Sequence, residues 1–326
     1  MHKTTIALSI LASMIVPQSS SIPITNTTYN SRKQDKPHYI LDRTIPVGGT
    51  PVDINVHFKT GDVYFTLITP KSGMAINRLN PNGEVETINS LFVGQSTAID
   101  NNNDIIYIAT NMGIVRYDKE DNESIAFTAY LEDVTYASVG NNGSVLYITT
   151  WPYNKVHKIT IENLNTTQKS YPYVTDGHGL TVDKKNNIYF IDTHTLYILK
   201  DGGTKPIKIT GVPYDTDCMV SVAKDGGVYA VDENGDFYMI NADNAYAKKL
   251  YSFNIEDVKG FAIDAEDNLI IGSATFHDPN TNSLPSSHFF CLFFIMTRHM
   301  TAPRLILGWR AIHGWRSPLI QFNNFK

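Results

Sequence analysis

A unit of about 41 residues recurs six times along the 326-residue chain, and no other feature of the sequence constrains the fold as strongly. Each copy carries a tyrosine or isoleucine at the same internal position: Tyr64, Tyr107, Tyr147, Tyr189, Tyr229 and Ile270. Successive copies are 43, 40, 42, 40 and 41 residues apart. A period this steady predicts a repeat architecture in which each unit packs against its neighbours.

The fourth copy shows what one unit contains. Its sequence, GLTVDKKNNIYFIDTHTLYILK (179–200), alternates apolar and polar residues in three short runs separated by polar turns. Period-two alternation rich in β-branched and aromatic residues predicts strands. Asp183 to Asn187 and Asp264 to Asn268 have the side chains that favour tight turns, as does the Gly-containing Asp225 to Gly227. Linking segments such as 205–212 and 246–253 supply a fourth strand, which makes each unit a propeller blade.

We therefore predict an all-β protein, a six-bladed β-propeller of four-stranded blades over residues 37–278. An N-terminal strand at 38–45 is expected to complete the last blade. The sixth copy loses the pattern after Phe276, and residues 279–326 contain no Asp or Glu but two of the three tryptophans. This change in composition predicts an incomplete sixth blade and a poorly ordered basic and aromatic tail.

The first 21 residues have the composition of a secretory signal peptide. Lys3 precedes an apolar run from Ile6 to Val16, which is too short to span a bilayer, and Pro17 and small residues follow. Residues 22–36 form an N-terminal extension in this interpretation. Four N-x-S/T sequences are candidate glycosylation sites, at Asn26, Asn122, Asn142 and Asn165. We expect a secreted, extracellular glycoprotein without a membrane span.

Composition and motifs narrow the functional classes. The net charge of -5 disfavours nucleic acid as a partner. Cys218 and Cys291 are too few for a disulfide framework, and the acidic neighbours of Cys218 predict a packed or bridged thiol rather than a nucleophile. The segments DNNNDI at Asp100 and DENGDF at Asp232 lie at hairpin turns, so we interpret them as turn chemistry rather than calcium loops. No cofactor is implied.

The repeats resemble the lepidopteran ommochrome-binding proteins and their secreted relatives over roughly residues 36–275. Three segments carry the resemblance: TTWPYNKVHK (149–158), DGHGLTVDKKNNIYFIDTHTLYIL (176–199) and DVKGFAIDAEDNLIIGS (257–273). The resemblance implies a secreted haemolymph propeller that binds ommochrome, a tryptophan-derived pigment, without catalysis. The chain departs from the family in its C-terminal tail and in lacking an evident cysteine near the mature N-terminus.

A ligand of a propeller is expected at the mouth of the central channel, where residues of all blades converge. A flat, polar aromatic pigment or metabolite needs ring faces and a few hydrogen-bonding groups. The candidate ligand-binding residues are Tyr136, Trp151, Tyr153, His178, Tyr214 and Asp215. Two alternatives stay open: a calcium-dependent lactonase or arylesterase, and a protein-binding extracellular propeller. The oligomeric state is not predicted.

Overall fold

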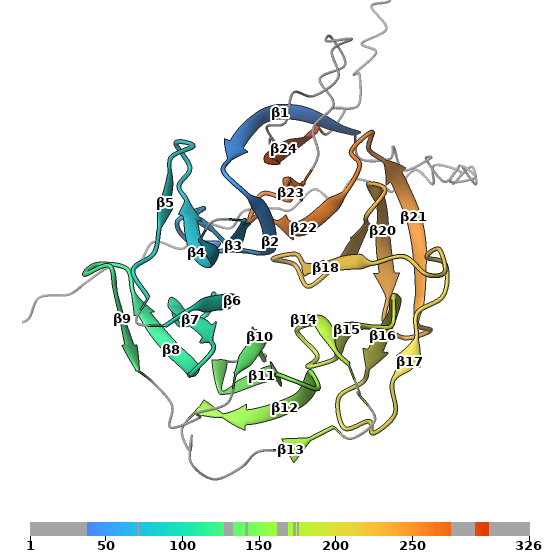
Figure 1. Ribbon diagram of the computed structural model, residues 1–326. Helices are drawn as coiled ribbons and strands as arrows, with labels where there is room; N and C mark the ends of the chain where they lie inside the picture. Colours follow the sequence, from blue (N-terminus) through green and yellow to red (C-terminus); the bar gives the residue numbers. More distant parts are fainter. Residues whose placement is uncertain are drawn as a thin grey trace, which may run out of the picture. The chain divides into compact units, whose positions relative to one another are not determined.

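The computed structural model describes residues 38–70, 72–90, 92–126, 133–140, 143–161, 169–171, 174, 176–274 and 291–299. Within this part of the chain six four-stranded antiparallel sheets are arranged around a central axis (Figure 1). The prediction of a six-bladed β-propeller is confirmed. In each sheet the first strand of the repeat lies next to the axis.

Each blade has the same order of strands, from the inner strand at the axis to the outer edge of the ring. Blades one and two are β2 (Thr50–Val56), β3 (Val63–Thr69), β4 (Gly73–Leu79), β5 (Val85–Thr87), and β6 (Gly94–Asp100), β7 (Ile105–Thr110), β8 (Gly113–Asp118), β9 (Glu123–Ala126). Blades three and four are β10 (Val134–Val139), β11 (Val145–Thr150), β12 (Lys155–Thr160), β13 (Lys169–Ser170), and β14 (His178–Val182), β15 (Ile188–Asp192), β16 (Thr195–Leu199), β17 (Ile207–Lys208). Blades five and six are β18 (Cys218–Val222), β19 (Val228–Asp232), β20 (Asp236–Asn241), β21 (Tyr246–Ser252), and β22 (Val258–Ile263), β23 (Leu269–Ser273), β24 (Cys291–His299), β1 (His38–Val47).

The predicted turn chemistry closes the hairpin between the first two strands of a blade. In blade four, Asp183 Oδ1 accepts the backbone N–H groups of Lys185 and Asn187, and Asp183 Oδ2 accepts Asn187 Nδ2 at 2.7 Å. Asp264 and Asn268 repeat the arrangement in blade six. These side chains satisfy turn N–H groups that have no strand partner, which fixes where each strand ends.

Apolar side chains from neighbouring blades interleave and form the core. The described residues contain six buried clusters, each spanning one junction between adjacent blades. Between blades four and five, for example, Tyr189 and Ile198 pack against Cys218 and Ala230. Cys218 is a free, buried thiol, as the packed alternative predicted. No blade buries both of its faces alone, so the ring is the unit of stability.

Cross-blade hydrogen bonds join the inner strands of five successive pairs of blades. All five pair a Ser, Thr or Asn side chain of one inner strand with a backbone group of the next. Asn55 Nδ2 donates to Thr97 O and Thr181 Oγ1 donates to Val220 O, while Ser96 Oγ accepts from Ala137 N, Ser138 Oγ from Val182 N and Ser221 Oγ from Ile263 N. At the sixth junction Gly260 lies so close to Ile54 that a Cβ would be 2.6 Å from that side chain. Ser, Thr and Asn side chains at five junctions and a glycine at the sixth therefore keep adjacent inner strands close together.

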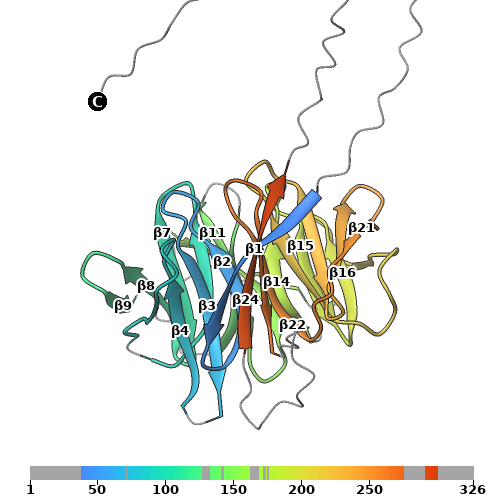
Figure 2. The same cartoon turned by 90° about the horizontal axis from the view of Figure 1, so that it is seen from above.

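The sixth blade is complete, and the prediction of an incomplete blade is wrong. Cys291–His299 pairs with β23 on one side and with β1 on the other. Figure 2 shows β24 next to β1. Phe293, Phe294, Ile295 and Met296 are all buried, because the strand is covered on both faces by neighbouring blades. A short continuous apolar run is typical of such a strand. The expected closure by the N-terminal strand is confirmed.

Several sequence predictions lie outside the described residues. They include the signal peptide at 1–21, the extension at 22–36, the remainder of the tail beyond 299 and the candidate glycosylation sites Asn26, Asn142 and Asn165. Asn122 is described, and it lies exposed in the turn between β8 and β9, where its Oδ1 accepts the Tyr117 hydroxyl at 2.9 Å. No helix among the described residues has the length and hydropathy needed to cross a membrane.

Candidate functional site

The ring encloses a central channel with a volume of about 1370 Å³. All six blades contribute to its wall, mainly through their inner strands. We call the end where these strands begin the channel mouth; Asp176, His178, His194, Asp217 and Lys259 line it. The other end is formed by the turns that follow the inner strands. The cavity is large enough for a ligand of several fused rings.

Tyr136 and His178 form an aromatic corner on the wall of the channel. They come from the inner strands of blades three and four, and their rings meet edge to face with centroids 6.3 Å apart and an interplanar angle of 87°. His178 Nε2 lies 2.9 Å from Asp176 Oδ1, and that carboxylate also accepts Asn154 Nδ2 at 2.8 Å. The hydrogen bond from Asn154, with a smaller contribution from His178, holds the pKa of Asp176 below its usual value. The imidazole therefore has a fixed acceptor and a defined orientation.

A second histidine–aspartate pair, missed by sequence reasoning, lies at the mouth in blades four and five. His194 Nδ1 is 2.9 Å from Asp217 Oδ1, and the hydrogen bond to this carboxylate raises the pKa of His194. His194 occupies the tight turn between β15 and β16 with a φ of 54°, and its side chain contacts the next blade through Asp217. Its position in the Asp-Thr-His turn was the available signal.

Asp53 is the second residue that sequence reasoning missed. It lies in β2, lines the channel, and accepts the Thr97 backbone N–H at 2.9 Å. Removal from solvent raises the pKa of its carboxyl to about 6, against the opposing effect of hydrogen bonds from Thr97, Ser96 and Asn55. An acidic residue inside an inner strand, in the segment TPVDINV, is the signal that could have found it.

Four of the six predicted ligand-binding residues do not line the channel. Trp151 and Tyr153 are 60% and 64% exposed in the turn between β11 and β12, and Lys155 Nζ lies 5.2 Å from the Tyr153 ring centroid. Tyr214 is 78% exposed beside the outer strand β17, with Lys208 Nζ 4.4 Å from its ring centroid. Asp215 is exposed next to it. The structure brings together only Tyr136 and His178 of the set, and ligand contact by any of the six stays a prediction.

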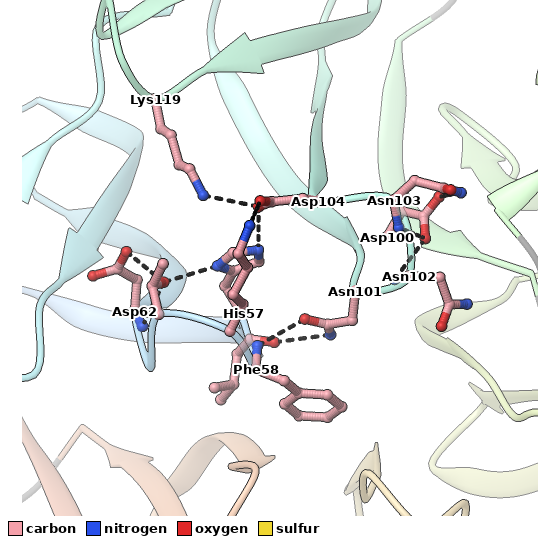
Figure 3. Close-up of polar contacts among 12 residues, drawn as sticks. His57, Phe58, Asp62, Asp100, Asn101, Asn102, Asn103, Asp104 and Lys119 are labelled. Carbon is pink, nitrogen blue, oxygen red and sulfur yellow. Dashed lines mark hydrogen bonds and ion pairs between the residues drawn. The ribbon is translucent and has the colours of Figure 1, made fainter.

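The far end of the channel carries a polar cluster that joins blades one and two (Figure 3). His57 is completely buried, and its Nε2 lies 2.8 Å from Asp104 Oδ1, an oxygen that also accepts Lys119 Nζ at 2.8 Å. Hydrogen bonds from Lys119 and Lys59 lower the pKa of Asp104. Asn101 accepts the Phe58 N–H and donates to Val56 O, so the turn after β6 is fastened to the end of β2. This cluster is an inter-blade contact.

The two acidic segments that were interpreted as turns have that role. Asp100 Oδ1 accepts the backbone N–H groups of Asn102 and Asn103, and Asp232 Oδ1 accepts those of Asn234 and Asp236. Within the described part of the chain no group of three or more His, Cys, Asp or Glu side chains is arranged to hold a metal ion.

Comparisons with known proteins define the fold. No protein-family model matches the chain, and no curated protein matches it. Luciferin-regenerating enzyme is similar in structure, with a TM-score of 0.55, 10% identity and coverage of 80% of this chain and 95% of that one. A streptogramin B lyase has a TM-score of 0.51 and 11% identity, with coverage of 80% of this chain and 98% of that one. Virginiamycin B lyase from Staphylococcus aureus has a TM-score of 0.50 and 14% identity, with coverage of 72% of this chain and 82% of that one. At these identities the likeness shows the fold alone: the chain is a six-bladed β-propeller with an open central channel.

Proposed function

We propose that the protein is a secreted binding protein that holds a small aromatic pigment or metabolite, ommochrome-like in chemistry, at the channel mouth without converting it. The observation that carries the proposal is the Tyr136–His178 corner, in which two rings from adjacent blades meet edge to face on the wall of a large channel. Such a corner offers one ring face and one ring edge to a flat ligand, a geometry that aromatic groups prefer.

The surroundings of this corner suit a ligand with an apolar body and polar edges. Ile191, Met219 and Val258 contribute apolar surface to the channel, while Asp176, Asp217 and Lys259 contribute charged groups at its mouth. Small-molecule sites combine these two kinds of surface in this way, because apolar contact supplies affinity and a few polar groups fix the orientation. The resemblance to ommochrome-binding proteins agrees with this chemistry.

The polar groups of the mouth favour retention of the ligand over turnover. Among the described residues neither His178 nor His194 hydrogen-bonds a hydroxyl or thiol that could act as a nucleophile; each is paired with an aspartate. The channel hydroxyls of Ser138 and Ser221 accept backbone N–H groups of neighbouring blades. Cys218 is buried, and burial raises the pKa of its thiol, which disfavours the thiolate.

Visible absorption titration with xanthommatin tests the proposal. We expect a saturable spectral shift in the wild type and weaker binding, by about threefold to tenfold, in His178→Ala and Tyr136→Ala, since an aromatic contact contributes about 0.5–1.5 kcal/mol. Tyr246→Ala, on the outer strand β21, is the matched control and is expected to bind like the wild type. Absence of any shift at high pigment concentration rejects pigment binding, and equal affinity in all variants rejects the corner as the site.

The two histidine–aspartate pairs favour a second candidate, an enzyme that uses one of them as a general base. Chromatography of the pigment after prolonged incubation with the protein separates the two functions. For a binding protein we expect unchanged pigment; product that accumulates in the wild type and is lost in His178→Ala and His194→Ala supports the enzyme.

Secretion is part of the proposal and has its own test. Expression of the full chain in insect cells should release the protein into the medium, and deletion of residues 1–21 should retain it inside the cells. Asn122→Gln should reduce the mass of the released protein by one glycan, because that asparagine is exposed in the β8–β9 turn.

A further inference from the structure

Asp53 is placed in the channel wall by an irregularity of the first inner strand. The register of β2 against β3 shifts between Val52 and Asn55, and Asp53 in between has a φ of 48°. Positive φ is uncommon for residues with a Cβ, and aspartate is among those that tolerate it. Bulges of this kind re-aim a side chain, here into the channel that Asp53 lines.

The Asp53 carboxylate has hydrogen bonds but no counter-charge. Its Oδ2 accepts the Thr97 N–H at 2.9 Å and Asn55 Nδ2 at 3.4 Å. No lysine, arginine or histidine in the described ranges forms an ion pair with it. Charges removed from bulk water are usually paired, so an unpaired carboxylate facing a cavity indicates a ligand that supplies the positive charge. The raised pKa of this carboxyl has the same physical cause.

Tyr136 adds an independent polar group at the same place. Its hydroxyl has no hydrogen-bond partner among the described residues, although the ring lies deep in the channel wall. Burial raises the pKa of the phenol to about 12, and the negative charges of Asp53 and Asp217 act in the same direction. Tyr136 thus lines the same channel as the Asp53 and Asp217 carboxylates of blades one and five, and its hydroxyl has no partner of its own among the described residues.

The remaining charges at the mouth leave the Asp53 carboxylate without a counter-charge. Lys259 Nζ is 2.7 Å from Asp257 Oδ1, so its charge is already paired. Asp217 uses Oδ1 for His194, which leaves its second oxygen able to accept a hydrogen bond from a ligand. The Asp53 carboxylate and the second Asp217 oxygen thus remain as acceptors in the channel that Tyr136 lines.

We propose that the channel binds the ammonium group of an aromatic amine, held by the carboxylates of Asp53 and Asp217 and by the Tyr136 hydroxyl. This inference rests on the proposed function, and it narrows the ligand class to aromatic compounds that carry a basic nitrogen. An ammonium group has three donors and no acceptor, so it suits a channel that presents acceptors from three blades. Charge-assisted hydrogen bonds of this type are stronger than neutral ones, and the Tyr136 ring adds a cation–π surface.

Isothermal titration with tryptamine and with 3-propylindole tests this assignment. The two probes have the same ring and nearly the same shape, but a methyl group replaces the ammonium group in the second. We expect tryptamine to bind the wild type at least tenfold more tightly. Asp53→Asn should remove most of that preference, Asp217→Asn should reduce it several-fold, and Tyr136→Phe about threefold. Asp225→Asn, in an exposed turn, is the matched control and should keep it.

Asp53→Asn is a variant that should fold. Asparagine tolerates positive φ, and its side-chain oxygen can still accept the Thr97 N–H, so the bulge keeps its hydrogen bond. Thermal unfolding of each variant checks this point. If Asp53→Asn is destabilised, the wild-type comparison of the two probes still decides the question.

The outcomes separate this inference from the proposed function. Equal affinity for both probes, no tryptamine binding, or a preference that survives Asp53→Asn overturns the ammonium site. Xanthommatin binding that persists in that case leaves the pigment proposal standing. Tryptamine binding with the expected variant pattern, but without xanthommatin binding, supports the ammonium site and rejects the pigment.

Discussion

His57 and His194 each lie within 3 Å of an aspartate, but the two pairs occupy opposite environments. His57 Nε2 and Asp104 Oδ1 are 2.8 Å apart between blades one and two, where the imidazole has no exposed surface. His194 Nδ1 and Asp217 Oδ1 are 2.9 Å apart at the channel mouth, where the two side chains are 60% and 46% exposed. The same pairing chemistry thus occurs once with a buried imidazole and once with an imidazole that water or a ligand can reach.

The contrast shows how a propeller separates stability from binding. The His57 imidazole between blades one and two is buried and has protein partners, so its loss should affect folding. Polar groups of the mouth have a partner on one side and the channel on the other, so their loss should affect ligands first. Matched variants in the two regions test this distinction.

The largest difference is expected between Asp104→Ala and Asp217→Ala. Asp104→Ala leaves the buried His57 imidazole without its acidic neighbour, and an unsatisfied buried polar group costs about 1–3 kcal/mol. Asp217→Ala removes the partner of the exposed His194 side chain, so it should change the free energy of unfolding by less than about 0.5 kcal/mol, as is usual for exposed positions, but it should weaken pigment binding. Urea unfolding measures both, with the exposed Asp121→Ala as control. Equal destabilisation by the two variants contradicts the distinction.

The pH dependence of stability should have opposite signs for the two histidines. Burial lowers the pKa of His57, so below about pH 6.5 the unfolded chain takes up a proton that the folded protein resists, and stability falls. The pKa of His194 is raised by Asp217, so its contribution is present below about pH 6.5 and is lost as the pH rises through the folded-state pKa.

Urea unfolding of the wild type, His57→Gln and His194→Gln between pH 5 and 8 checks these signs. On acidification the wild-type-minus-variant difference in unfolding free energy should fall for His57 and rise for His194. The slope from one proton cannot exceed about 1.4 kcal/mol per pH unit. A rise for His57 as well would mean that Asp104 keeps that imidazole protonated in the fold, and the contrast between the pairs would lose its electrostatic basis.

A smaller effect is expected at the cross-blade hydrogen bonds. Ser138→Ala removes the acceptor of Val182 N–H between blades three and four, and a hydrogen bond of this kind contributes about 1 kcal/mol. Thr204→Ala, exposed between β16 and β17, is the control. Because Ser138 also lines the channel, xanthommatin titration of the same variant shows whether the residue acts only between blades. Loss of binding without loss of stability would place Ser138 with the ligand site instead.

Local sequence determined most of the fold but little of the site. The period, the Asp–Asn turns and the closing strand near residue 38 can each be recognised in the linear sequence, so they could be predicted. Seventeen residues separate Ser273 from Cys291 where the other blades have a tight turn, and this spacing hid the third strand of blade six. Its apolar run was present in the sequence but out of phase with the period.

The site depends on geometry that no single repeat encodes. Asp53 reaches the channel through a bulge, and His194 reaches Asp217 across a blade junction through a turn with positive φ. Tyr136 and His178 were found because they begin inner strands. Trp151, Tyr153 and Tyr214 were chosen for their aromatic character in loops, and their distance from the axis depends on which strand each loop joins.

The smallest effects are expected at these exposed aromatic residues, and they test whether the ligand site extends beyond the channel. Tyr214→Ala and Trp151→Ala should change xanthommatin affinity by less than about twofold and the unfolding free energy by less than about 0.5 kcal/mol, because both side chains are mostly exposed outside the channel. His178→Ala in the same titration is the positive reference. Strong weakening by Tyr214→Ala alone would move the ligand from the axis to the rim beside β17. The channel would then be a consequence of ring closure, and binding would depend on the loops that leave the outer strands.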